Sequence, residues 1–153
     1  MRTIEDLVAW ILTGIIFIGI AYGVSSCRNA YADEVVIQTI AMEAANQLDD
    51  DAYGQYAVAS VIVNRSRQRG QTLEEVCLAR KQFSCWNDPK WAKTWLDNNY
   101  TIKTRWRASK ALKRAILEPI KGVNHYHTVS VKPCWAKGKT PSYRIGEHLF
   151  YNL

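Results

Sequence analysis

An uncharged run of eighteen residues near the N-terminus constrains this chain more than any other feature. It extends from Leu7 to Val24 and reads LVAWILTGIIFIGIAYGV. As a helix it would be about 27 Å long, close to the thickness of the hydrocarbon core of a bilayer. It has no polar face, which a helix on the surface of a globular domain would need. The run therefore predicts one N-terminal transmembrane helix, and we expect residues 7–24 to contact the membrane.

The N-terminal region, residues 1–32, can serve as a signal anchor or as a signal peptide. Residues 30–32 offer a small-x-small cleavage site, and residues 24–27 resemble a lipobox in which Cys27 would be acylated. We favour an uncleaved anchor, because the apolar run is long for a cleaved signal and two acidic residues precede it. All three alternatives place residues 33–153 outside the cytoplasm, either anchored to the inner membrane or exported.

The remaining residues, 33–153, have the composition of one folded domain. The whole chain is 48% hydrophobic and 22% charged, which excludes a disordered or low-complexity protein. Its net charge of +6 is unevenly distributed, because residues 80–144 contain fifteen basic and three acidic side chains. Such a basic segment indicates a polyanionic partner, either nucleic acid, anionic lipid or an anionic wall polymer.

Hydrophobic periodicity predicts a mostly helical domain. Apolar residues at helical spacing indicate helices over residues 34–48, 52–68 and 104–117, the last with Ala108, Ala111, Leu112, Ala115 and Ile116 facing inward. Thr72 and Glu75 form a capping box before a short helix over residues 73–79.

The C-terminal part has a different pattern. Residues 125–129 and 146–151 alternate in the manner of strands, and residues 80–100 and 130–145 are expected to be irregular. The fold class predicted is mainly α with a small β element.

Glu43 is the carboxylate most suited to catalysis. It lies near the end of an otherwise apolar helix, next to Met42 and Ala44. A carboxyl group among apolar side chains loses hydration, which favours its protonated form, and a general acid must hold its proton at neutral pH. A surface glutamate or one in a salt bridge is the alternative.

Several motifs of this chain resemble the SleB-type cell wall hydrolases. Met42-Glu43-Ala44 is followed by the block from Gly54 to Arg65, by Gln82-Phe83-Ser84, by Trp135, and by Ile145-Gly146-x-His148-x-Phe150-Tyr151. These blocks occur in the order of the family and cover about residues 34–152. The resemblance implies a lysozyme-like, lytic-transglycosylase-like α+β fold that cleaves the glycan strands of peptidoglycan.

The resemblance also implies roles for individual residues. Glu43 matches the catalytic acid, which would protonate the glycosidic oxygen between N-acetylmuramic acid and N-acetylglucosamine. Attack by the muramic 6-hydroxyl would give a 1,6-anhydro sugar, as in a lytic transglycosylase, and attack by water would give hydrolysis, as in a muramidase. Asn64 and Arg65 are expected to hold loops by hydrogen bonds. The candidate substrate-binding residues are Gln55, Gln82, Phe83, Ser84, Tyr126 and Trp135.

No second carboxylate stands out as a catalytic partner. Most glycosidases use two, but residues 49–51 have the character of a solvated loop, and Glu147 occupies a variable position of the family. The family usually has an acid four positions after the catalytic glutamate, where this chain has Gln47. These observations favour the single-acid transglycosylase route. No metal ion or other cofactor is expected.

Two other function classes remain open. Cys85 or Cys134 could be the nucleophile of a cysteine peptidase or amidase, with one of the three histidines as base. The basic segment and its tryptophans could bind nucleic acid, or form a non-enzymatic wall-binding module. Export argues against a specific nucleic acid as the partner of this chain. A phage endolysin or a bacterial wall-remodelling enzyme is more consistent with an exported domain. One disulfide among Cys77, Cys85 and Cys134 is plausible outside the cytoplasm.

Overall fold

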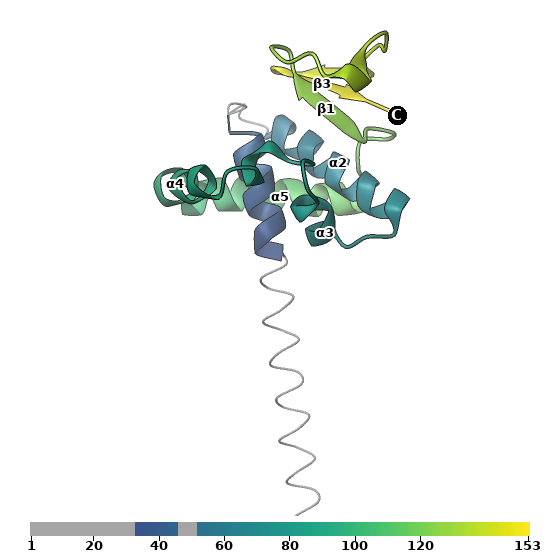
Figure 1. Ribbon diagram of the computed structural model, residues 1–153. Coiled ribbons are helices and arrows are strands. Elements are labelled where there is room, and N and C mark those ends of the chain that lie inside the picture. The colour runs from purple at the N-terminus through teal and green to yellow at the C-terminus, as the bar shows by residue number, and fades with distance from the viewer. Residues whose placement is uncertain (1–32, 46–51) are drawn as a thin grey trace, which may run out of the picture. The chain divides into compact units, whose positions relative to one another are not determined.

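The computed structural model describes residues 33–45 and 52–153 of the chain. The part from Val35 onward is a compact unit of helices and one small antiparallel sheet, which confirms the predicted α+β class (Figure 1). Besides a first helix over residues 33–43, its regular elements are α2 (Tyr53–Arg69), α3 (Leu73–Leu78), η1 (Ser84–Trp86), α4 (Pro89–Asn99), α5 (Ile102–Leu117), β1 (His125–Thr128), η2 (Cys134–Ala136), β2 (Tyr143–Ile145) and β3 (His148–Tyr151).

The predicted membrane segment, residues 7–24, lies outside the described residues. Within the described ranges, every helix is too short or too polar to cross a bilayer.

Helix α2 is the centre of the packing. Eleven of its seventeen residues are buried, because α5 and α3 cover one side and the sheet covers another. Ala57 and Val61 pack with Val123 and Phe150 beneath the sheet, while Val58 and Ile62 belong to the larger core among the helices. The predicted bounds, 52–68, are nearly correct, and the helix ends at a left-handed glycine, Gly70, with φ of 62°.

The first helix is shorter than predicted. It ends at Glu43, and residues 44–45 form a turn, so the expected continuation to residue 48 is wrong in its described part. Apolar spacing continued through Ala44 and Ala45, but both small side chains also fit a turn. Glu43 is therefore the last helical residue rather than an interior one.

Helix α5 begins two residues before the predicted start, because Thr101 accepts a hydrogen bond from the Thr104 amide as an N-cap. Its alanines 108, 111 and 115 and Leu112 are buried as predicted. Ile116 was expected to face inward but is 45% exposed.

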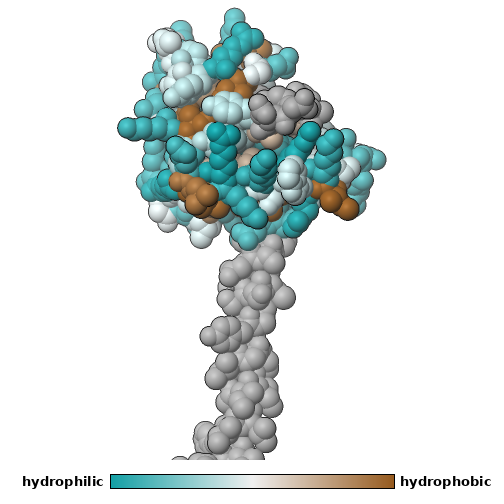
Figure 2. All heavy atoms as spheres, turned by 180° about the vertical axis from the view of Figure 1, so that it is seen from behind, coloured by the Kyte–Doolittle hydropathy of each residue, from teal (hydrophilic) through white to brown (hydrophobic). Residues whose placement is uncertain are grey.

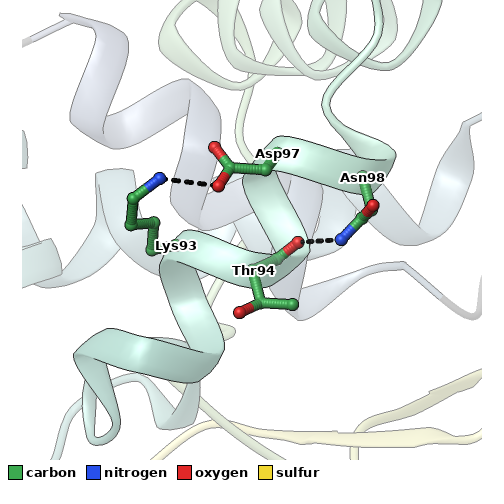
Figure 3. Close-up of polar contacts among 4 residues, drawn as sticks. All are labelled: Lys93, Thr94, Asp97 and Asn98. Atoms are coloured by element: carbon green, nitrogen blue, oxygen red, sulfur yellow. Dashed lines mark hydrogen bonds and ion pairs between the residues drawn. The ribbon is translucent and has the colours of Figure 1, made fainter.

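Helix α4 lies within residues 80–100, for which the sequence pattern predicted irregular structure. Asp88 caps two amides of its first turn, and Pro89 occupies the first helical position, where its fixed φ is favourable. Along the exposed side, Lys93 forms an ion pair with Asp97 at 2.6 Å, and Asn98 donates a hydrogen bond to the Thr94 carbonyl (Figure 3). Pro89, which lies in the segment expected to be irregular, thus starts a helix.

The sheet has the strand order β1-β3-β2 and is antiparallel throughout. The predicted strands at 125–129 and 146–151 correspond to β1 and β3, whereas β2 lies in the expected loop. In the register, Thr128 pairs with His148 and Tyr126 with Phe150. This register brings the end of β1 beside the start of β3, which matters for the site described next.

Candidate active site

Glu43 lies at the end of the first helix, and two distant segments contact its carboxyl group. Its Oε1 accepts hydrogen bonds from the Ser84 hydroxyl at 3.0 Å and from the Cys85 amide at 2.8 Å. Its Oε2 accepts a hydrogen bond from the Tyr126 hydroxyl at 2.6 Å. Both oxygens therefore have polar partners, which differs from the apolar surroundings that the sequence suggested.

The 3₁₀ turn η1 is attached to the same face of the first helix. Thr39 precedes Glu43 by four residues, so the two side chains lie one above the other. The Trp86 indole donates a hydrogen bond to Thr39 Oγ1 at 2.9 Å, and the Thr39 hydroxyl donates to the Val35 carbonyl. Anchored by Trp86, η1 presents the Ser84 hydroxyl and the Cys85 amide to Glu43.

Tyr126 approaches Glu43 from the sheet. Its ring stacks on Phe150 at 5.5 Å and meets His148 edge-on at 5.1 Å. Burial raises the pKa of the Tyr126 hydroxyl well above its usual value, and the charge of Glu43 adds to this effect. Tyr126 therefore remains a protonated donor, which fixes the orientation of the Glu43 carboxyl group.

A pocket of about 120 Å³ opens at Glu43; it is called the Glu43 pocket below. Its lining residues come from the end of the first helix, η1, α4 and the sheet: Met42, Glu43, Ala45, Ser84, Cys85, Trp91, Thr128, Glu147 and His148. Glu43 is thus a half-buried carboxylate that a ligand can reach.

Comparison with protein families gives a match over residues 49–151 to the family described as Cell Wall Hydrolase. The match spans more than half of the chain. The chain belongs to the cell wall hydrolase family. Comparisons with curated proteins and with solved structures gave no match. Family membership supports a peptidoglycan hydrolase. Glu43 precedes the matched segment, so its role is argued from the geometry.

Two of the six predicted substrate-binding residues of this cell wall hydrolase lie at Glu43. Ser84 and Tyr126 both donate hydrogen bonds to its carboxyl group. Their contact with the acid suggests that they position it.

The other four predicted residues, like Tyr126, do not line the Glu43 pocket. Gln55 is 3% exposed within α2, and Phe83 is 2% exposed in the core. The Gln82 amide oxygen accepts a hydrogen bond from Arg69 at 3.1 Å. Trp135 packs edge-on against Tyr151 and His127. Their roles in substrate binding stay predictions.

The three pocket residues that come from the sheet region were not among the predicted site residues. Glu147 was set aside, and Thr128 and His148 were not proposed as ligand contacts, yet all three line the Glu43 pocket. The antiparallel register between β1 and β3 brings them together, and no local signal in the sequence specifies a register of this kind. The pocket of this cell wall hydrolase therefore contains a second carboxylate besides Glu43.

Two residues at the end of α2 hold the loop before the sheet, as predicted. The Asn64 amide donates to the carbonyls of Ile120 and Val123 at 2.9 and 2.7 Å. Arg65 Nε donates to the Asn124 carbonyl at 2.6 Å, and its guanidinium lies 5.4 Å from the centre of the Phe83 ring. Burial lowers the pKa of Arg65 to about 10.

For the cysteines of the described region, the sequence raised two expectations, a disulfide and a catalytic nucleophile, and the structure supports neither. Cys77, Cys85 and Cys134 are all free thiols, so the predicted disulfide among them is wrong. Burial is the main cause that raises the pKa of Cys85, and it raises that of Cys77 to about 12. A buried thiol with a raised pKa is a poor nucleophile.

Cys134 is exposed and lines a separate hollow with His127. Both ring nitrogens of His127 already have partners, the Thr128 carbonyl at 2.8 Å and the Tyr151 hydroxyl at 2.9 Å. His127 is therefore not placed to act as a base for Cys134. No group of three potential metal ligands occurs in the described ranges, 33–45 and 52–153.

Proposed function

We propose that this cell wall hydrolase is a peptidoglycan glycosidase in which Glu43 acts as general acid and base. The observation that carries the proposal is a carboxyl group held by three donors from two distant segments and open to a pocket. Positioning of this kind is what a proton-transfer group requires.

The hydrogen bonds at Glu43 are compatible with both protonation states of a general acid. The hydroxyls of Ser84 and Tyr126 can donate or accept, whereas the Cys85 amide can only donate. When Glu43 carries a proton, a hydroxyl can rotate to accept it. When the proton has left, three donors face the carboxylate.

In the proposed reaction, protonated Glu43 gives its proton to the glycosidic oxygen between N-acetylmuramic acid and N-acetylglucosamine. The bond to that oxygen breaks, and an oxocarbenium-like centre develops on the muramic residue. On the single-acid route Glu43, now a carboxylate, then takes a proton from the attacking group. Attack by the muramic 6-hydroxyl completes a lytic transglycosylase reaction, and attack by water completes a hydrolysis.

The position of Glu147 is relevant to whether water or the muramic 6-hydroxyl attacks. Inverting glycosidases use a second carboxylate to activate water, whereas a transglycosylase needs only the acid that is also the base. Glu147 lines the same pocket as Glu43, which supports including the water route alongside the single-acid route that the sequence favoured.

Mass spectrometry of digested peptidoglycan tests the proposal. Wild type should release muropeptides, with anhydromuramyl ends for the transglycosylase or reducing ends for the hydrolase. Glu43→Gln should lower the amounts of both products by about a hundred- to ten-thousandfold, while the exposed Asp97→Asn, a matched removal of one carboxylate, should leave both unchanged. Glu147→Gln should lower only the reducing-end products. New amino groups in place of new sugar ends would instead indicate the cysteine peptidase or amidase.

The cellular setting is part of the proposal. An enzyme that acts on peptidoglycan must reach the wall, which is consistent with anchoring through residues 7–24 and an extracytoplasmic position of residues 33–153. A role as a phage endolysin or in bacterial wall remodelling follows from the same substrate. Fractionation of cells that produce the 153-residue chain, with and without residues 7–24, tests this placement.

A further inference from the structure

A second hollow, of about 570 Å³, lies between the start of α2 and the length of α5. It is called the α5 groove below. None of its lining residues belongs to the Glu43 pocket, so a ligand in the α5 groove would touch different side chains from a ligand at Glu43.

Four cations of α5 line this groove. Lys103, Arg107, Lys110 and Arg114 follow one another at intervals of four, three and four residues, so they form one stripe about 16 Å long. No acidic side chain of the described residues lines the groove. The ion pair found among the described residues joins Lys93 and Asp97 of α4, away from the groove lining. Like charges at this spacing repel one another, so the stripe is better accounted for by an anionic ligand than by stability.

Aromatic rings hold two of these cations in place. The Arg114 guanidinium lies 4.0 Å from the centre of the Tyr56 ring and 5.8 Å from that of Tyr53. The Lys110 ammonium lies 5.3 Å from the centre of the Trp106 ring. Such cation–π contacts order the charged groups before a ligand arrives, which reduces the entropy lost on binding.

Trp106 itself is 61% exposed. An indole in that position offers an apolar face to the solvent beside ordered cations. A ligand with both anionic groups and flat apolar faces would satisfy both kinds of side chain.

We propose that the α5 groove binds a carboxylate-bearing strand of peptidoglycan, separately from the Glu43 pocket. In this arrangement the cations pair with carboxylates of the peptide stems, and Trp106 and Tyr53 stack on sugar rings. The choice of polymer rests on the proposed function, because the enzyme must hold an anionic wall strand while it cleaves it. The groove would keep the enzyme on its substrate between cuts.

The shape of this surface favours a polymer chain over a membrane. A concave groove encloses an extended strand, whereas a lipid surface is contacted by a continuous apolar area. Figure 2, seen from behind relative to Figure 1, shows mostly hydrophilic residues with hydrophobic ones in separate patches. Exposed apolar residues that are scattered in this way do not form a membrane-binding face.

Sedimentation with purified peptidoglycan sacculi tests the proposal in the full 153-residue chain carrying Glu43→Gln, so that binding is read without cleavage. The groove variant combines Lys103→Gln, Arg107→Gln and Lys110→Gln. Arg114 is kept, because its guanidinium packs on the rings of Tyr53 and Tyr56. The matched control combines Lys90→Gln, Lys113→Gln and Lys121→Gln, which removes the same charge away from the groove. Circular dichroism checks that each variant is folded.

We expect the groove variant to bind sacculi about tenfold more weakly, as three exposed ion pairs would give, and the control less than about twofold more weakly. Trp106→Ala should also weaken binding. Sacculi whose carboxylates have been amidated should bind the Glu43→Gln protein equally with and without the groove substitutions. Equal losses in the groove variant and the control would overturn the proposal, because binding would then depend on net charge alone.

Vesicles of phosphatidylglycerol and a DNA duplex are measured in parallel. If the groove variant lost binding only to the vesicles or only to the DNA, and bound sacculi as before, the assignment to peptidoglycan would be overturned. Because the assay reads binding, its failure would leave the proposed role of Glu43 untouched. Full glycan cleavage by the Glu43→Gln protein would overturn that role and leave the binding result standing.

Discussion

The Glu43 pocket takes its side chains from segments far apart in the sequence, whereas the α5 groove takes most of its side chains from one helix. In the first, η1 and β1 reach Glu43 from positions 41 to 83 residues away. In the second, four cations follow from helical spacing alone. The two regions also differ in size, about 120 against 570 Å³.

This difference reflects what each region is proposed to do. Proton transfer needs one group fixed to a fraction of an ångström, which requires hydrogen bonds from several directions. Binding of a flexible anionic strand needs charge of the right sign along a line, which tolerates mobile side chains. Direct hydrogen bonds therefore fix the Glu43 carboxyl group in the pocket, whereas contacts with aromatic rings orient Lys110 and Arg114 in the groove.

The largest expected effect separates turnover from binding. Glu43→Gln should lower glycan cleavage by about a hundred- to ten-thousandfold, the usual contribution of a general acid, while sacculus binding changes little. Cleavage assays and sedimentation on the same preparation check this prediction. Equal loss of both would show that pocket and groove are one site.

Tyr126→Phe should have the next largest effect. It removes the donor to Glu43 Oε2 at 2.6 Å and keeps the ring that packs on Phe150. Loss of a hydrogen bond to a charged group, about 1.5–3 kcal/mol, predicts a decrease in kcat of roughly ten- to a hundredfold with KM nearly constant. If Tyr126 only supports packing, kcat and its pH profile should stay as in wild type.

Salt should affect the two regions differently. Exposed charges are screened within about 10 Å at 0.1 M ionic strength and within about 3 Å at 1 M. Between these conditions, binding of the Glu43→Gln protein to sacculi should weaken by about tenfold. Cleavage of a short uncharged glycan by wild type should change by less than about twofold. Salt-independent sacculus binding would contradict an electrostatic role for the groove.

The smallest expected effect concerns stability at acidic pH. Burial lowers the pKa of His148 from its usual value of 6.5, although the charges of Glu43 and Glu147 oppose this change. The unfolded chain then binds more protons below pH 6.5 than the native one, so acidification should destabilise the fold by at most about 1.4 kcal/mol per pH unit from this residue.

Urea unfolding of wild type and His148→Gln at pH 7.5 and 5.5 measures this contribution. The variant should lose less stability than wild type between the two pH values. The same dependence in both proteins would show that other groups cause it.

The sequence by itself determined the parts of this protein that depend on local spacing. Periodic apolar residues indicated α2 and α5, and the capping box at Thr72 and Glu75 indicated the start of α3, where both of its hydrogen bonds form. The basic side of α5 follows from the same spacing. Glu43 stood out because one acid interrupted an apolar helix, and motifs in the order of the family pointed to that family.

Only the tertiary structure decided which groups meet at Glu43. The register between β1 and β3 aligns Thr128 with His148, and the bond between Trp86 and Thr39 positions η1. Strand register and long-range hydrogen bonds depend on how whole elements pack, and a single residue carries no signal for them. For that reason the place of Glu147 in the pocket was not predicted, and neither was the edge-on contact between Trp135 and Tyr151.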